Sequence, residues 1–254
     1  MDKFSVVMPI HNERENLLYS LNGLFQLEPD EIIIILDRCN DGSRAIIESL
    51  SAKLSYKGKL RLIEVSEDFP DWSYRVTKLF RMGFEAAQND TILTMAADII
   101  PDTRIREYVS LIQSSKVKLV SFGLKYYPVD TLYFVKRLIT LVFPSRGFSG
   151  VFLFSKMAWQ ETEDEEKVKR ILKSQDTFLA EAISKKYSTY HVWLNVIHLR
   201  LRKDIKDQYM RGVTAYQVSK KSLPSVFVSS VIYLRPMMLK GFLDACERAR
   251  KSHV

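Results

Sequence analysis

Short apolar runs alternate with longer amphipathic segments in the first half of the chain. Residues 4–8 and 32–36 are β-branched apolar runs bounded by turn residues, which is typical of strands buried on both faces. Between them, leucines recur at helical spacing after Asn12, a residue type that can cap a helix. The pattern therefore predicts a strand, a helix and a second, parallel strand.

The same alternation continues along the chain. It predicts helices over residues 43–54 and 73–88 and strands over residues 60–65 and 91–95. Such an order is typical of an α/β fold with an open, doubly wound, mostly parallel sheet flanked by helices. Ligands of these sheets bind beyond the carboxyl ends of the strands, so the residues that follow each strand are the candidate site.

The second half is less regular. It contains further predicted elements, namely strands over 119–124, 151–154 and 189–198 and a helix over 176–185. From Lys203 onward the chain is rich in Lys, Arg and Tyr, and it includes an apolar stretch over residues 223–243. We expect one α/β domain over residues 1–200 and a basic, apolar helical extension over residues 201–254, packed on the domain or on a membrane surface.

Charge and cysteine content restrict the expected binding partners and cellular compartment. Lys and Arg number 38 against 30 Asp and Glu, a net charge of +8 that favours a sugar diphosphate, a phospholipid surface or a nucleic acid as partner. Cys39 and Cys246 form neither a disulfide framework nor a paired zinc motif. The first residues lack the layout of a cleaved secretory signal. We therefore expect a cytoplasmic protein.

Polar clusters follow three of the predicted strands. They are His11-Asn12-Glu13, the run from Asp37 to Ser43, and the run from Asp98 to Asp102. The glycine-rich phosphate loops G-x-G-x-x-G and G-x-x-x-x-G-K-[ST] are absent, which disfavours a Rossmann dehydrogenase and a P-loop NTPase. If the chain binds a nucleotide, acidic side chains and a metal have to hold it.

These residues resemble the family-2 glycosyltransferases, which have a GT-A fold. The likeness begins with residues 4–13 and 31–43, and continues through Asp98 and Gly150 to Gln175-Asp176-Thr177, within about residues 4–200. It implies an inverting transfer of a sugar from a nucleotide-diphosphate donor to an acceptor.

The resemblance also implies roles for the residues after the first two strands. In the family one strand ends at Pro-x-x-Asn-Glu and the next at an Asp that contacts the nucleotide base. The implied nucleotide and substrate contacts here are Pro9, His11, Asn12, Glu13, Asp37, Asp41, Ala97, Gly150 and Gln175. Turn and capping roles for Asp37 and Asp41 are an open alternative, and such a role explains Asp41 better than Asp37.

The family's metal site is an Asp-x-Asp motif, and the corresponding triplet here is Ala96-Ala97-Asp98. The first acidic residue is missing. By resemblance Asp98 and His198 bind Mg²⁺ or Mn²⁺, which neutralises the departing diphosphate. A hydrogen-bonded histidine at a strand end is the alternative for His198. Asp176 matches the catalytic base of the family, and it can equally be a helix N-cap.

Several basic residues are further candidates. Arg75, Lys78 and Arg81 recur at helical spacing, so one helix face could hold the diphosphate or simply be a solvated basic face. The same two interpretations apply to three later arginines, which are Arg200, Arg202 and Arg211.

Two apolar segments carry interspersed basic residues, over residues 133–143 and 223–243. The first is too short to span a bilayer, and Pro224 and Pro236 interrupt the second. Interfacial helices on the anionic inner face of a membrane fit this pattern, and would suit a lipid-linked acceptor. Packing against the core and a homodimer contact are equally open.

Two other functions compete with sugar transfer. A sugar-phosphate nucleotidyltransferase shares the α/β architecture, but its Gly-rich, Arg-containing loop is replaced by His11-Asn12-Glu13. A degenerate nucleotide-sugar-binding module would explain the absence of an acid at Ala96. Nucleic-acid binding is not expected, because acidic strand ends repel phosphates and no RNA-binding motif occurs.

Overall fold

The computed structural model describes residues 2–54, 56–68, 72–126, 137–138, 150–162, 175–199, 205–217, 221–232 and 236–251. The chain divides into two compact units. The first comprises Met1–Val129 and Val135–Leu199, and the second comprises Asp130–Phe134 and Arg200–Val254.

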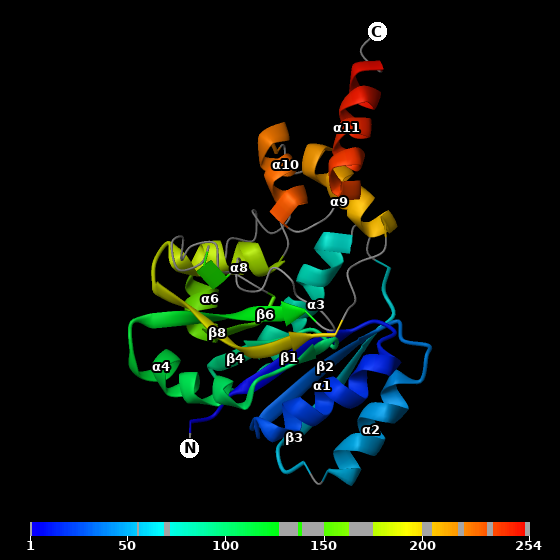
Figure 1. The fold of residues 1–254 in the computed structure, drawn as a ribbon. Helices are drawn as coiled ribbons and strands as arrows, with labels where there is room; N and C mark the ends of the chain where they lie inside the picture. Colours follow the sequence, from blue (N-terminus) through cyan, green and yellow to red (C-terminus); the bar gives the residue numbers. More distant parts are fainter. Residues whose placement is uncertain are drawn as a thin grey trace. The chain divides into compact units, whose positions relative to one another are not determined.

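Eight strands of the first unit's described residues form one sheet (Figure 1). They are β1 Ser5–Ile10, β2 Glu31–Asp37, β3 Lys59–Val65, β4 Thr91–Thr94, β5 Ile99–Ile100, β6 Val117–Tyr126, β7 Phe152–Ser155 and β8 Ser188–His198. Their order is β3-β2-β1-β4-β7-β6-β8-β5. The predicted mostly parallel sheet is confirmed, with β7 antiparallel to β4 and β6, and β5 antiparallel to β8.

Helices cover both faces of this sheet (Figure 1). Those described are α1 Arg14–Gln26, α2 Ser43–Lys53, α3 Trp72–Ala86, the 3₁₀ helix η1 Thr103–Tyr108, α4 Val109–Ser114, α6 Lys156–Thr162 and α8 Gln175–Ser184. Because strand side chains alternate, Met8 and Ile34 face the core beneath α1, whereas Val7 and Ile35 face the core that contains α3 and α8 residues. Burial on both faces explains why β1 and β2 are almost wholly apolar.

The shared strand direction places the candidate site. β1, β2 and β4 are parallel neighbours, and β8 runs parallel to β6 with the same direction as β4. Their carboxyl ends therefore lie along one edge of the sheet. The residues after these strands, which the sequence marks as polar, gather at that edge.

The predicted helix cap at Asn12 is wrong. Helix α1 begins at Arg14, and its N-cap is Glu13, which makes no side-chain capping hydrogen bond. Asn12 has a left-handed backbone with φ 52°, whereas a capping residue normally lies in the β region. Its Oδ1 accepts a hydrogen bond from the Asn40 backbone N–H at 2.9 Å, which joins the turn after β1 to the turn after β2.

The second unit contains three described helices, α9 Ile205–Gln217, α10 Leu223–Ile232 and α11 Pro236–Lys251. Ala215, Val226, Met238 and Phe242 form a small core of their own. Gly212 brings α9 very close to α11, because a Cβ there would lie 1.9 Å from the Met238 carbonyl oxygen. In the part of the chain that the structure describes, no helix has both the length and the apolar character needed to cross a bilayer.

Candidate active site

Basic groups surround the carboxylate of Asp37 at the end of β2. Its side chain is 6% exposed and forms an ion pair with the guanidinium of Arg75, which reaches it from α3 and is 9% exposed. The Nε of Arg38 lies 3.8 Å from Oδ1 of Asp37, and Nδ1 of His11 lies 3.7 Å from Oδ2. His11 Nδ1 is also 2.7 Å from the Asp37 carbonyl oxygen. The predicted nucleotide contacts His11 and Asp37 are thus brought together.

The three basic residues of α3 do not share one environment. Arg75 is buried, and its Nε has no hydrogen-bond partner within the described structure. Lys78, one turn further on, is exposed, and Arg81 is half-buried. The interpretation as a uniformly solvated basic face is therefore wrong for Arg75, which helical spacing placed on the same face but which packs towards Asp37.

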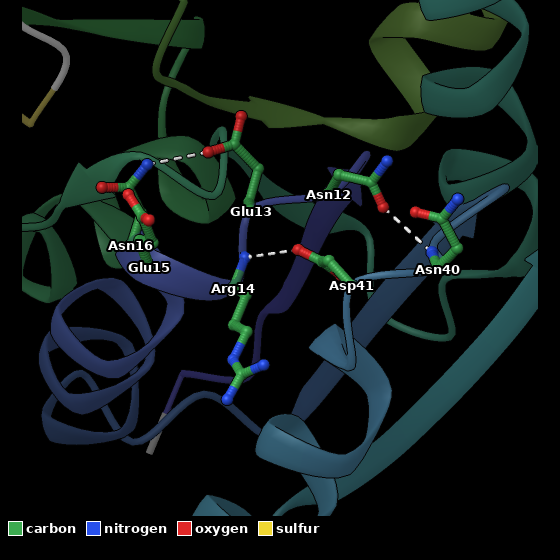
Figure 2. Close-up of a pocket in the computed structure, with 7 residues that line it drawn as sticks. All are labelled: Asn12, Glu13, Arg14, Glu15, Asn16, Asn40 and Asp41. Atoms are coloured by element: carbon green, nitrogen blue, oxygen red, sulfur yellow. Dashed lines mark hydrogen bonds between the residues drawn. The ribbon is translucent and has the colours of Figure 1, made fainter.

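A polar pocket of about 490 Å³ lies between the start of α1 and the loop before α2 (Figure 2). Seven residues line it, namely Asn12, Glu13, Arg14, Glu15, Asn16, Asn40 and Asp41. Oε2 of Glu13 accepts a hydrogen bond from the Asn16 amide at 2.8 Å, which fixes one wall. Asn12, Glu13 and Asp41, all predicted from the sequence, contribute to this pocket, while His11 is not among its lining residues.

Asp41 joins the first two helices. Its Oδ2 accepts from the Arg14 backbone N–H at 2.9 Å, and its Oδ1 accepts from the Ser43 backbone N–H at 3.0 Å. Burial opposes ionisation, but hydrogen bonds from Ser43 and Arg14 outweigh it and lower the pKa of Asp41. The turn role considered for Asp41 is confirmed by these bonds, and contact with a nucleotide stays a prediction.

Asp98 and His198 meet at the same sheet edge. After β4 the chain turns, with the Ile99 N–H donating to the Ala96 carbonyl at 3.2 Å, and enters β5. β5 pairs with the end of β8, where Ile99 lies opposite His198. The Leu199 N–H donates to the Asp98 carbonyl at 2.8 Å. As a result, Nε2 of His198 lies 3.6 Å from Oδ2 of Asp98.

This pair fits a divalent cation that also binds a phosphate ligand. The described residues contain no group of three or more His, Cys, Asp or Glu able to hold a metal. Mg²⁺ is usually held by one or two protein carboxylates and completes its coordination with water and substrate phosphates. Asp98 and His198, 6% and 17% exposed, could supply one carboxylate and one imidazole ligand. Ala96 packs partly buried against the core and offers no side-chain oxygen.

The other predicted contacts lie in three places. Pro9 is within β1, where it pairs with Ile35 of β2. Ala97 is buried in the turn that presents Asp98. Gly150 is exposed and lies two residues before β7.

Gln175 and Asp176 are the first two residues of α8. Asp176 therefore lies in the first described turn of α8, and its roles as base and as helix cap both stay predictions. Arg200 and Arg202 lie outside the described residues, and Arg211 belongs to α9 in the second unit.

A comparison with protein families decides the family. The profile of Glycosyl transferase family 2 matches residues 5–170, more than half of the chain. This chain belongs to glycosyl transferase family 2. The match includes Asp37 and Asp98 and ends before Asp176 and His198, so those two positions lie beyond the part that identifies the family. Family membership supports a glycosyltransferase that uses a nucleotide-sugar donor.

Solved structures share the fold of this family 2 protein. Residues 1–349 of S. aureus TarS with UDP-GlcNAc match with TM-score 0.57 and 12% identity, over 85% of this chain and 67% of that one. Glucosyl-3-phosphoglycerate synthase from Mycobacterium tuberculosis with Mg²⁺ and UDP gives 0.56 and 13%, over 86% and 77%. The mannosyltransferase PcManGT from Pyrobaculum calidifontis with GDP-Man and Mn²⁺ gives 0.64 and 14%, over 98% and 75%. No curated protein matches the sequence.

Sequence reasoning missed several residues of the candidate site. Asn40, Arg14 and Asn16 line the pocket, and the buried ion pair gives Arg75 a partner that its helical spacing did not indicate. Asn40 could have been found, because it belongs to the polar loop after the second strand. No sequence pattern indicates the pairing of Arg75 with Asp37, since this contact depends on how α3 packs on the sheet.

Proposed function

We propose that this protein transfers a sugar, with inversion at the anomeric carbon, from a nucleotide-diphosphate donor to an acceptor, with the help of Mg²⁺ or Mn²⁺. One observation carries the proposal beyond family membership. Asp98 and His198 are far apart in sequence, but Nε2 of His198 lies 3.6 Å from Oδ2 of Asp98. They lie at the carboxyl edge of the sheet, where the loops after β1 and β2 also begin.

The nucleoside occupies the edge formed by the ends of β1 and β2. Asp37 accepts a hydrogen bond from the base, and its ion pair with Arg75 holds the carboxylate in one orientation. The amides and carboxylates of the pocket in Figure 2 suit a ligand rich in hydroxyl groups, such as a ribose or a sugar. Pro9 near the end of β1 and Glu13 just before α1 shape the turn between these two elements. Lys78 and Arg81 of α3 face the diphosphate.

Asp98 and His198 would hold the divalent cation, and the cation would neutralise charge on the departing nucleoside diphosphate. Asp98 is buried and His198 is mostly buried, which reduces competition by bulk water. Arg200 and Arg202, which follow His198 in the sequence, are further basic candidates for binding the phosphates.

Asp176 acts as the base. Inversion requires the acceptor hydroxyl to lose its proton while it attacks the anomeric carbon on the face opposite the leaving group. Gln175 and Gly150 help to place the acceptor and the donor sugar. A lipid-linked acceptor and a cytoplasmic location on the inner membrane face are further parts of the proposal.

A second candidate function has one observation in its favour. Ala96 replaces the first acid of the family's metal motif and packs against the core, so the site has one carboxylate where relatives of the motif have two. A protein that binds nucleotide sugars without transferring the sugar would fit this loss.

Product formation separates these two functions. The purified protein is incubated with Mn²⁺, a UDP- or GDP-sugar and a panel of hydroxyl acceptors that includes lipid-linked ones, because uridine and guanosine nucleotides are bound in the similar structures. Release of the nucleoside diphosphate is measured by mass spectrometry. Asp176→Asn should keep donor binding and lose at least about 100-fold in turnover. Glu181→Gln, on the same helix, is the matched control and should keep turnover. Equal turnover in wild type and Asp176→Asn would refute the role of Asp176, and binding without turnover in wild type would favour the binding module.

A further inference from the structure

Helix α10 of the second unit presents an apolar face to solvent. Leu223, Phe227 and Val231 follow one another at intervals of four residues, so they lie on one side of the helix. Their exposed fractions are 47%, 54% and 55%, and neighbouring Val228 is 52% exposed. An adjacent side of the helix is used for folding, because Val226 is completely buried in the core that also contains Met238 and Phe242. We call the four exposed residues the α10 face.

The net charge of the protein lies in the same part of the chain. Residues 200–254 contain 12 Lys and Arg against 4 Asp and Glu, whereas residues 1–199 contain 26 of each, so the whole excess of +8 comes from the C-terminal segment. Within the described part, Lys221 is exposed just before α10 and Lys240 is exposed on α11. Three more cations, Arg248, Arg250 and Lys251, occupy the last turn of α11.

We propose that the α10 face docks the protein on an anionic lipid bilayer. Apolar side chains gain free energy by leaving water for the interfacial region, and basic residues nearby gain by approaching anionic headgroups. The helix has 10 residues, a length of about 15 Å, so it lies in the interface and does not cross a hydrocarbon core of about 30 Å.

The charge selects this partner over two others. A second copy of the chain would bring two segments of charge +8 together, and their repulsion opposes self-association through the α10 face. A nucleic acid would satisfy the charge, but its phosphates would offer no apolar environment to Leu223, Phe227 and Val231. An anionic membrane satisfies both features at once. The proposal concerns the second unit and does not depend on the transferase chemistry.

Flotation of the full-length protein with vesicles tests the proposal. Vesicles of phosphatidylcholine with about one third phosphatidylserine should carry the protein upward at low salt, whereas pure phosphatidylcholine should carry far less. Phe227→Ser combined with Val231→Ser should weaken partition by about tenfold or more, because two apolar side chains lose their burial. Leu18→Ser, an equally exposed leucine on α1, is the matched control and should bind like wild type. Circular dichroism and light scattering establish the fold and the oligomeric state of each variant.

Three outcomes would overturn the proposal. Absence of wild-type binding to anionic vesicles would refute it directly. Binding that the double variant leaves unchanged would show that charge alone attracts the protein and that the α10 face takes no part. A wild-type dimer that the double variant converts to monomer, with no flotation of either, would assign the face to a second copy of the chain.

Discussion

Replacing Arg75 with Met removes the main partner of a buried carboxylate. The Asp37 side chain is 6% exposed and that of Arg75 is 9% exposed, so water cannot replace the guanidinium as the partner of the carboxylate. Breaking a buried ion pair by deleting one partner typically costs about 3–5 kcal/mol. Nδ1 of His11 and Nε of Arg38 lie 3.7 Å and 3.8 Å from the Asp37 carboxylate oxygens, so they partly compensate for the missing guanidinium. We therefore expect Arg75→Met to lower the free energy of unfolding by about 3 kcal/mol, the lower end of that range.

Urea denaturation followed by circular dichroism measures this loss, and thermal unfolding checks it. For a domain of 150–250 residues, about 3 kcal/mol corresponds to a fall of roughly 6–12 °C in melting temperature. Lys78→Met is the matched control, because Lys78 is an exposed cation one turn along the same helix. It should change the free energy of unfolding by about 1 kcal/mol or less.

A double-mutant cycle separates the ion pair from lost packing. Asp37→Asn removes the charge that Arg75 compensates, so the double variant Asp37→Asn with Arg75→Met should be more stable than the sum of the single losses predicts, by about 1–3 kcal/mol. Additive losses, or an Arg75→Met variant as stable as Lys78→Met, would refute the role of the pair in positioning Asp37.

Three further substitutions have defined outcomes. Gly83→Ala should cost about 1–3 kcal/mol in urea denaturation, since a Cβ would lie 2.2 Å from a methyl group of Val7; a neutral effect would contradict this close packing. Gly212→Ala should reduce hydrogen-exchange protection in α9 and α11, because its Cβ would lie 1.9 Å from the Met238 carbonyl oxygen; unchanged protection would contradict this contact. Burial lowers the pKa of His191 to about 4, so the folded state binds fewer protons than the unfolded state between pH 4 and 6.5, and stability falls as the pH is lowered through that window. His191→Gln should flatten this part of the stability curve, and an equally steep curve would argue against the lowered pKa.

The parallel half of the fold could be predicted because its central strands β1, β2 and β4 are buried on both faces. The apolar runs of β1 and β2 leave little choice of structure, and the segments between them are long enough for crossover helices. The direction of β7 could not be predicted, since an apolar run reads the same in a parallel and an antiparallel strand. The two residues of β5 are too few to show any period, and Ile99 is in a strand only because β8 provides a partner.

The location of the candidate site could be predicted from the sequence, but only some of its contacts could. Ligands of such sheets bind at the carboxyl ends of the strands, so the sequence alone marks His11, Asp37 and Asp98 as site residues. The pairing of His198 with Asp98 rested on family resemblance, and the strand pairing of β5 with β8 gives its physical reason. Asn12 was mistaken for a cap because sequence does not reveal its left-handed backbone.

The most direct test of the proposed function is the effect of Mn²⁺ on donor binding. Melting temperatures are measured for wild type, Asp98→Asn and the control Glu161→Gln, with UDP- and GDP-sugars in the presence and absence of Mn²⁺. Near-saturating ligand, at about 100 times its Kd, stabilises the folded state by about 2.7 kcal/mol. We predict a shift for wild type and Glu161→Gln with one nucleotide and only with Mn²⁺, and none for Asp98→Asn. An equal shift without Mn²⁺, or an unchanged shift in Asp98→Asn, would contradict a metal-assisted donor site at Asp98 and His198.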